Sequence, residues 1–103
     1  MSKISVIAKL TAAAGSTDDL GTALADLIEA ANDEHGLEIY SVHRANDEAD
    51  TFYFFELYRD GDAIDEHGKG DAMKAAMAAV GTLLAGRPEV IRMTPVAAKG
   101  LAL

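Results

Sequence analysis

The segment TFYFFELYR, residues 51–59, has the pattern of a β-strand that is apolar on both of its faces. Successive side chains of a strand point to opposite faces, so aromatic and aliphatic residues fall on both sides of this one. A strand with one face in water would instead alternate between apolar and polar residues. The segment therefore requires a fold in which both faces of the sheet are covered. It also places a carboxylate, Glu56, where water is an unexpected neighbour.

Three further strands are predicted from alternating apolar residues and from the turn-forming residues between them. The last of them begins at Arg87-Pro88, where a missing backbone donor does little harm. The four predicted strands are ISVIAKLTA (4–12), LEIYSVHR (37–44), TFYFFELYR (51–59) and RPEVIRMTPV (87–96).

Two amphipathic helices are predicted where apolar residues recur at steps of three and four. The first begins at Ser16 or Thr17, whose side chains can cap a helix, and ends at Gly36, where glycine permits a left-handed stop. The second begins near Asp71 and ends at Gly86. A short helix, broken by glycines, is expected within residues 60–70.

The resulting order is β-α-β-β-α-β, which predicts an α+β, ferredoxin-like fold with an antiparallel sheet. We expect a single domain over residues 1–103, with a core over 4–96 and a C-terminal tail over 97–103. Two helices can cover only one face of four strands. An identical sheet from a second copy is the simplest cover for the other face, so a homodimer is expected. The alternative is a monomer with an exposed apolar face.

Charge and composition exclude several functional classes. The formal net charge of −8 disfavours binding to nucleic acids and to anionic membranes. No segment has the length and hydropathy of a membrane span or a signal peptide. The absence of cysteine excludes disulfides and fits a cytoplasmic protein. No nucleotide-binding motif or metal-ligand spacing is found, so we expect no cofactor and no metal.

Glu56, Tyr58, His67 and His43 are the candidate catalytic residues. Glu56 and Tyr58 share one strand face, and a carboxylate that is desolvated there has a raised pKa unless a donor offsets it. His67 or Arg44 is a possible donor. A bond to His67 in a cavity favours chemistry, whereas a bond to Arg44 or to a backbone donor favours a structural role. His43 is either a proton-transfer group in a pocket or a half-buried strand histidine with one hydrogen bond.

The pattern F-x-x-x-E-x-Y-x-D-x-x-A-x-x-x-H, from Phe52 to His67, resembles the antibiotic biosynthesis monooxygenase (ABM) family. The resemblance extends over about residues 4 to 96 and implies a dimeric α/β barrel. It also implies a pocket between sheet and helices, in which quinols or aromatic polyketides are oxidised by oxygen without an added cofactor. Glu56, Tyr58 and His67 fall on recurrent positions of the family, although most members have Trp in place of Tyr58. The expected substrate pocket contains Phe54, Met73, Met77 and Val80.

Other branches related to this family lead to different functions. A haem-degrading branch has a His, a Trp and an Asn at positions that read Met77, His67 and Ala8 here, which argues against haem degradation. A branch that processes phosphorylated autoinducer-2 shares the Glu-x-Tyr strand, and in its usual Thr-Pro-His-Tyr/Phe-Lys stretch only Lys74 is retained. An isomerase of a small phosphorylated carbonyl compound, with an anion site at Lys74, is therefore one alternative. A non-catalytic protein that holds an apolar ligand is another.

Overall fold

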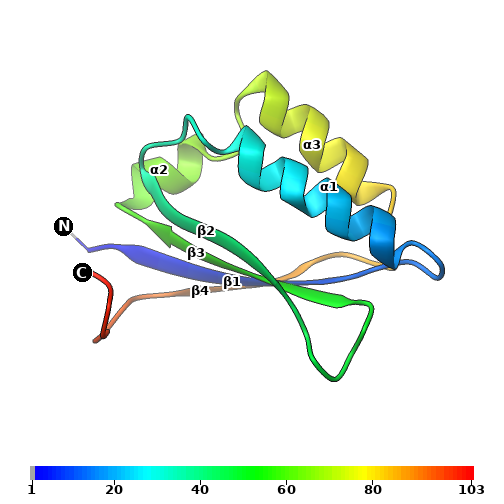
Figure 1. The fold of residues 1–103 in the computed structure, drawn as a ribbon. Helices are drawn as coiled ribbons and strands as arrows, with labels where there is room; N and C mark the ends of the chain where they lie inside the picture. Colours follow the sequence, from blue (N-terminus) through cyan, green and yellow to red (C-terminus); the bar gives the residue numbers. More distant parts are fainter. Residues whose placement is uncertain (1) are drawn as a thin grey trace.

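The computed structural model describes residues 2–103, which form one four-stranded sheet and three helices (Figure 1). In chain order the elements are β1 (Ile4–Thr11), α1 (Thr17–Ala30), β2 (Leu37–Arg44), β3 (Thr51–Tyr58), α2 (Gly61–Glu66), α3 (Asp71–Gly81) and β4 (Glu89–Met93). This is the predicted β-α-β-β-α-β order with the short α2 placed after β3. The α+β, ferredoxin-like fold predicted from the sequence is confirmed. None of the helices in residues 2–103 is long and apolar enough to cross a membrane.

The sheet has the strand order β2-β3-β1-β4, and all neighbouring strands are antiparallel. β3 lies inside the sheet and pairs along its length with both β1 and β2. Residues that pair directly share a sheet face, so the register defines rows of side chains across the sheet. One row runs from Tyr40 through Glu56 and Val6 to Arg92.

The helices lie on one face of the sheet, where α1 and α3 pack side by side and α2 lies beside the end of β3 (Figure 1). The leucines of α1 at positions 20 and 24 are fully buried against this face. The main core joins residues of β1, α1, β3 and α3, including Leu10, Leu20, Leu24, Phe52, Phe54 and Met73. Glu56 lies on the helix-covered face, beside Val6 and Tyr40.

The opposite face of the sheet is not covered by helices of the same chain. Ile7, Phe55 and Ile91 lie side by side on it, and Ile91 is 58% exposed. On this face Leu57 is buried, Ile7 and Phe55 are half-buried, and Ile91 is exposed, so the expectation that both faces are buried is met only in part within one chain. We call this surface, centred on Ile7, Phe55 and Ile91, the open face.

Two predicted helix ends were wrong, each for a physical reason. α3 ends at Gly81 and not at Gly86, because residues 83–85 bond to the end of β1. The Leu83 carbonyl accepts from Ala13 N–H at 2.8 Å, and Ala85 N–H donates to Thr11 at 2.8 Å. α1 ends at Ala30, six residues before Gly36, and a turn connects it to β2.

The fourth strand is shorter than predicted, and the caps differ in detail. β4 covers Glu89–Met93 and not residues 87–96. Pro88 and Pro95 flank it, and neither can donate a backbone hydrogen bond to a neighbouring strand. Ser16 occupies the predicted cap position of α1, but its side chain makes no capping bond there.

Candidate functional site

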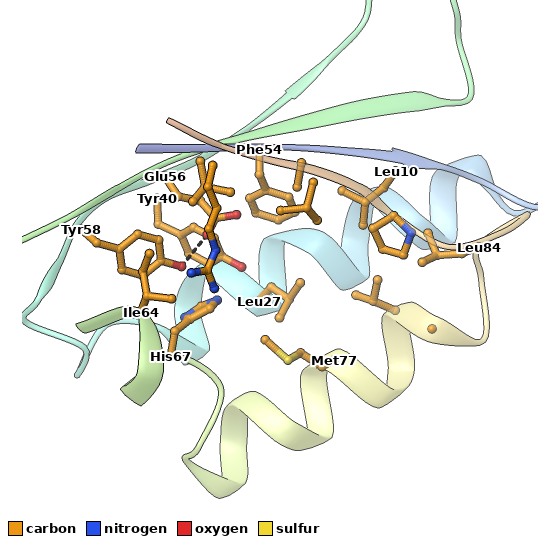
Figure 2. Close-up of a pocket in the computed structure, with 17 residues that line it drawn as sticks. Leu10, Leu27, Tyr40, Phe54, Glu56, Tyr58, Ile64, His67, Met77 and Leu84 are labelled. Carbon is orange, nitrogen blue, oxygen red and sulfur yellow. Dashed lines mark hydrogen bonds between the residues drawn. The ribbon is translucent and has the colours of Figure 1, made fainter. Parts of the chain in front are cut away.

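A cavity of about 500 Å³ lies between the helix-covered face of the sheet and the helices (Figure 2). This volume falls within the range of about 300–1,000 Å³ that small-molecule sites occupy. Its walls are mainly apolar and include Val6, Ala8, Leu27, Phe54, Met77 and Val80. The polar side chains that line it are Tyr40, Glu56, Tyr58, His67 and Arg92.

Glu56 and Tyr58 form a buried hydrogen-bonded pair on β3. Both side chains point into the cavity because residues two apart on a strand share a face. The Tyr58 hydroxyl donates to Glu56 Oε1. Tyr58 is 2% exposed and Glu56 is 8% exposed, so this bond satisfies a carboxylate that water scarcely reaches. The donor to Glu56 is thus Tyr58, and neither His67 nor Arg44 takes that role.

Burial shifts the ionisation of these groups. Desolvation raises the pKa of Glu56, and the bond from Tyr58 and the nearby charge of His67 offset part of that rise. The pKa of Tyr58 is raised by burial and by its bond to Glu56. Burial also raises the pKa of Tyr40, with a further contribution from the charges of Glu56 and Glu34. The two tyrosine hydroxyls therefore remain protonated donors at neutral pH.

His67 follows α2 and extends its ring between two tyrosines. Its Nδ1 lies 2.6 Å from Glu34 Oε1, and the two side chains are 14% and 20% exposed. The imidazole meets the Tyr40 and Tyr58 rings edge-on, with centroid distances of 5.3 and 5.7 Å. In the neutral imidazole, an acceptor at Nδ1 selects the tautomer in which Nδ1 carries the proton and Nε2 has the free lone pair. The pair resembles the base and orienting carboxylate found in acid–base catalysis.

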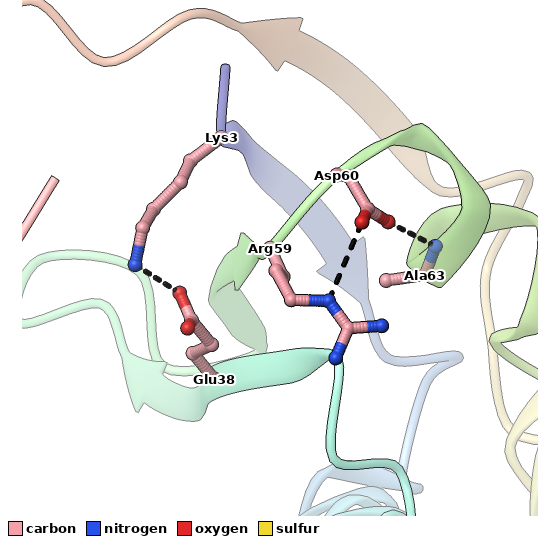
Figure 3. A network of polar contacts seen from close by, with 5 residues as sticks. All are labelled: Lys3, Glu38, Arg59, Asp60 and Ala63. Atoms are coloured by element: carbon pink, nitrogen blue, oxygen red, sulfur yellow. Dashed lines mark hydrogen bonds and ion pairs between the residues drawn. The ribbon is translucent and has the colours of Figure 1, made fainter. Parts of the chain in front are cut away.

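The position of His67 depends on how α2 is attached to β3. Asp60 caps α2, since its Oδ1 accepts from Ala63 N–H at 2.9 Å, and its Oδ2 accepts from Arg59 Nε at 3.3 Å (Figure 3). The Ala63 N–H bond lowers the pKa of Asp60. On its other side Ala63 meets Gly36, where an added Cβ would lie 2.6 Å from the Ala63 Cβ. Gly36 is thus needed for a close approach. The predicted left-handed helix stop at Gly36 is wrong, because its φ is not positive.

The structure separates several predicted site residues from this cavity. His43 lies on the open side of the sheet, is exposed, and is 2.9 Å from the Ser41 hydroxyl. Arg44 donates to the Ala49 carbonyl at 2.8 Å and lies over the Phe52 ring.

The predicted pocket residues are also divided. Phe54, Met77 and Val80 line the cavity as expected, whereas Met73 is 1% exposed in the adjoining core and does not line it. Lys74 is exposed on α3 and does not line the cavity either.

Three polar residues at the site were not predicted from the sequence: Glu34, Tyr40 and Arg92. Tyr40 and Arg92 could have been found from strand register, since each falls in the row of Glu56 once the strands are paired. Glu34 sits in the turn after α1, 33 residues from His67 in sequence, and nothing in its local pattern indicates that contact. No group of three or more His, Asp or Glu side chains in residues 2–103 has an arrangement that could hold a metal ion.

The fold and the cavity define a small α+β protein with an internal apolar site that has acid–base groups on its polar wall. The family model of antibiotic biosynthesis monooxygenases matches residues 3–79. The chain therefore belongs to the antibiotic biosynthesis monooxygenase family. A comparison with curated proteins gave no match.

Solved structures with the same fold cover nearly the whole chain. A candidate antibiotic biosynthesis monooxygenase from Caulobacter crescentus CB15 is 30% identical, with a TM-score of 0.86 over 93% of this chain and 92% of that one. A protein from Mycobacterium tuberculosis is 27% identical, with a TM-score of 0.84 over 94% and 98% of the two chains. A protein of unknown function from Nitrosomonas europaea is 28% identical, with a TM-score of 0.83 over 99% and 97%.

Proposed function

We propose that this protein is a monooxygenase that oxidises a small phenolic or quinol-like compound with molecular oxygen and no added cofactor. The observation that carries the proposal is the pairing of His67 with Glu34 on the wall of an apolar cavity of about 500 Å³. Membership of a family named for monooxygenases supports the reaction class.

The chemistry requires a base, hydrogen-bond donors and exclusion of water. His67 Nε2 takes the proton of a substrate hydroxyl, and Glu34 stabilises the imidazolium that forms. The electron-rich phenolate reduces oxygen, a ring carbon forms a C–O bond, and the proton held by His67 completes a hydroperoxide. Loss of the hydrogen on that carbon and cleavage of the O–O bond leave a carbonyl, and the outer oxygen departs as water. The substrate thus loses two hydrogens and gains one oxygen, while one O₂ becomes that oxygen and one water.

The tyrosine hydroxyls have a distinct role in this scheme. Tyr40 lines the cavity with its pKa raised by burial, so it remains a donor to oxygen atoms that gain charge during the reaction. Tyr58 already donates to Glu56, and this bond holds the carboxylate in place on the cavity wall. The stacking of Tyr40 on Phe54, with centroids 4.8 Å apart, fixes the ring orientation.

We further propose that two copies associate through their open faces. Ile7, Phe55 and Ile91 form an apolar row there that no helix of the same chain covers. A second, identical face is the cover that matches it in shape and chemistry. Each cavity then remains within one chain, on the far side of its own sheet.

The oxidation is tested with menadiol under ¹⁸O₂, because label in the product distinguishes monooxygenation from spontaneous oxidation. We expect oxygen uptake above the spontaneous rate, with one labelled oxygen in the organic product. His67→Ala should lower kcat about 10²–10⁴-fold, the usual contribution of a general base. His43→Ala, which changes a histidine outside the cavity, should retain activity. Ligand retained without turnover would instead indicate a binding protein.

Glu34 is tested in the same assay as a positioning residue. Glu34→Gln keeps an acceptor for the Nδ1 proton and should retain part of the activity, whereas Glu34→Ala should lower kcat with little change in KM. Asp33→Ala, at the exposed neighbouring position, is the matched control. Equal activity of Glu34→Ala and Asp33→Ala would refute the orienting role of Glu34.

A further inference from the structure

Arg92 places a positive charge on the cavity wall, toward the edge of the sheet opposite Tyr40. Tyr40 on β2 and Arg92 on β4 lie at the two ends of one row of side chains, with Glu56 and Val6 between them. Because neighbouring strands are about 4.8 Å apart, the Cα atoms of Glu56 and Arg92 are separated by about 10 Å. The small apolar side chains of Val6 and Ala8 lie on β1 between them.

The guanidinium of Arg92 has no hydrogen-bonding or charged partner among the residues that the structure describes. Within residues 2–103 the same is true of Arg87, which lies outside the cavity, whereas Arg44 and Arg59 each bind an oxygen. Among the described residues that line the cavity, Arg92 is the only lysine or arginine. This free cation occurs in a chain with 17 acidic and 9 basic residues, where acidic partners are plentiful.

The cavity opens to solvent on this side. Val90 is 59% exposed and Arg92 is also exposed, yet both line the cavity. A ligand that enters here passes Arg92 before it reaches Glu56 and His67. The guanidinium is planar, and its paired N–H groups match the two oxygens of a carboxylate.

We propose that Arg92 is an anion-binding subsite that selects hydroxylated aromatic carboxylates. The carboxylate binds Arg92, the rings lie against Val6 and Ala8, and the hydroxyl at the far end reaches His67. The reverse orientation is disfavoured because the carboxylates of Glu56 and Glu34 lie at that end of the cavity. The inference rests on the proposed function in one respect only, which is the assignment of the end of the ligand that reacts.

The test compares two ligands that differ in charge and little in shape: 6-hydroxy-2-naphthoate and 6-hydroxy-2-naphthamide. Binding is measured by calorimetry under nitrogen, so that no oxidation is needed. The protein should bind the acid at least about tenfold more tightly than the amide, as a charged hydrogen bond implies. Arg92→Gln should lower affinity for the acid about 10- to 100-fold and leave affinity for the amide within about twofold. Arg92→Lys should show an intermediate loss.

Arg87→Gln is the matched control, because it removes the same charge from an exposed residue that does not line the cavity. It should bind both ligands as the unaltered protein does. Equal affinities for acid and amide, an equal loss in Arg87→Gln, or no binding of either ligand would overturn the subsite. Selective binding of the acid, with no labelled oxygen entering either menadiol or 6-hydroxy-2-naphthoate under ¹⁸O₂, would uphold the subsite and refute the proposed oxidation.

Discussion

Glu56 shows how a single hydroxyl makes a buried carboxylate tolerable inside a sheet. The position before it and the position after it face the open side, so Glu56 can reach only groups on the helix-covered face. Tyr58, two residues on, supplies the donor. The tyrosine is therefore part of what keeps Glu56 in the cavity wall.

The raised pKa of Glu56 predicts how stability depends on pH. Because burial raises the pKa above its ordinary value of 4.5, ionisation of Glu56 favours the unfolded chain. The stability that the protonated form contributes is present in full below that value and is lost as pH rises through the raised pKa. Glu56→Gln removes this loss. As pH rises, the free energy of unfolding of Glu56→Gln should therefore increase relative to that of the unaltered protein.

Urea unfolding between about pH 4 and about pH 8 measures this difference. Glu48→Gln, which alters an exposed carboxyl in the β2–β3 turn, is the control and should track the unaltered protein at each pH. A constant difference between Glu56→Gln and the unaltered protein across this range would contradict a raised pKa at Glu56.

At the scale of elements, strands could be predicted from the sequence more completely than helix ends. β2 and β3 have the predicted bounds to within one residue, because alternation and the polar turn at 45–50 are local signals. The end of α3 depends on a competition that is not local, in which residues 83–85 bond to β1 instead of continuing the helix. Apolar periodicity alone cannot show which partner takes those backbone groups.

The residues of the candidate site also differ in whether local sequence signals could predict them. Glu56, Tyr58 and His67 could be selected because strand period and chain proximity bring them to one cavity. The placement of His43 needed the register of the β2–β3 pair, which sets it on the side opposite Glu56. The bond between Glu34 and His67 needed the packing of the whole α1–β2 turn against α2.

The contact between the α1–β2 turn and α2 makes a prediction about Gly36. A Cβ at this position would lie 2.6 Å from the Ala63 Cβ, a separation that neither backbone can tolerate without shifting. Gly36→Ala should therefore lower the free energy of unfolding by about 1–3 kcal/mol, the usual cost of overpacking. Activity should fall as well, because α2 positions His67. Gly61→Ala, where an added Cβ meets nothing within 4 Å, is the control in urea unfolding. Equal stability of the two variants would show that α2 moves freely.

At the scale of the whole molecule, the two faces of one sheet have separate roles. The helix-covered face forms the cavity, and its apolar residues serve both as core and as cavity wall. The open face has apolar residues that no helix in residues 2–103 covers; Ile7 and Phe55 are half-buried there and Ile91 is exposed. This division accounts for a β3 that is apolar on both sides. It also means that a change on one face can be made without altering the other.

Adjacent residues of β4 allow the proposed dimer to be tested with a matched pair. Ile91 is 58% exposed on the open face, and Val90 is 59% exposed on the cavity side of the same strand. Two-fold symmetry places Ile91→Asp twice in the interface, and each carboxylate buried without a partner costs more than the roughly 1–3 kcal/mol of an uncharged polar group. Ile91→Asp should therefore dissociate the dimer, while Val90→Asp should not. Light scattering should give about twice the chain mass of 10.8 kDa for the unaltered protein and for Val90→Asp. A single-chain mass for the unaltered protein would exclude the dimer. Dissociation by Val90→Asp alone would place the contact on the cavity side of β4.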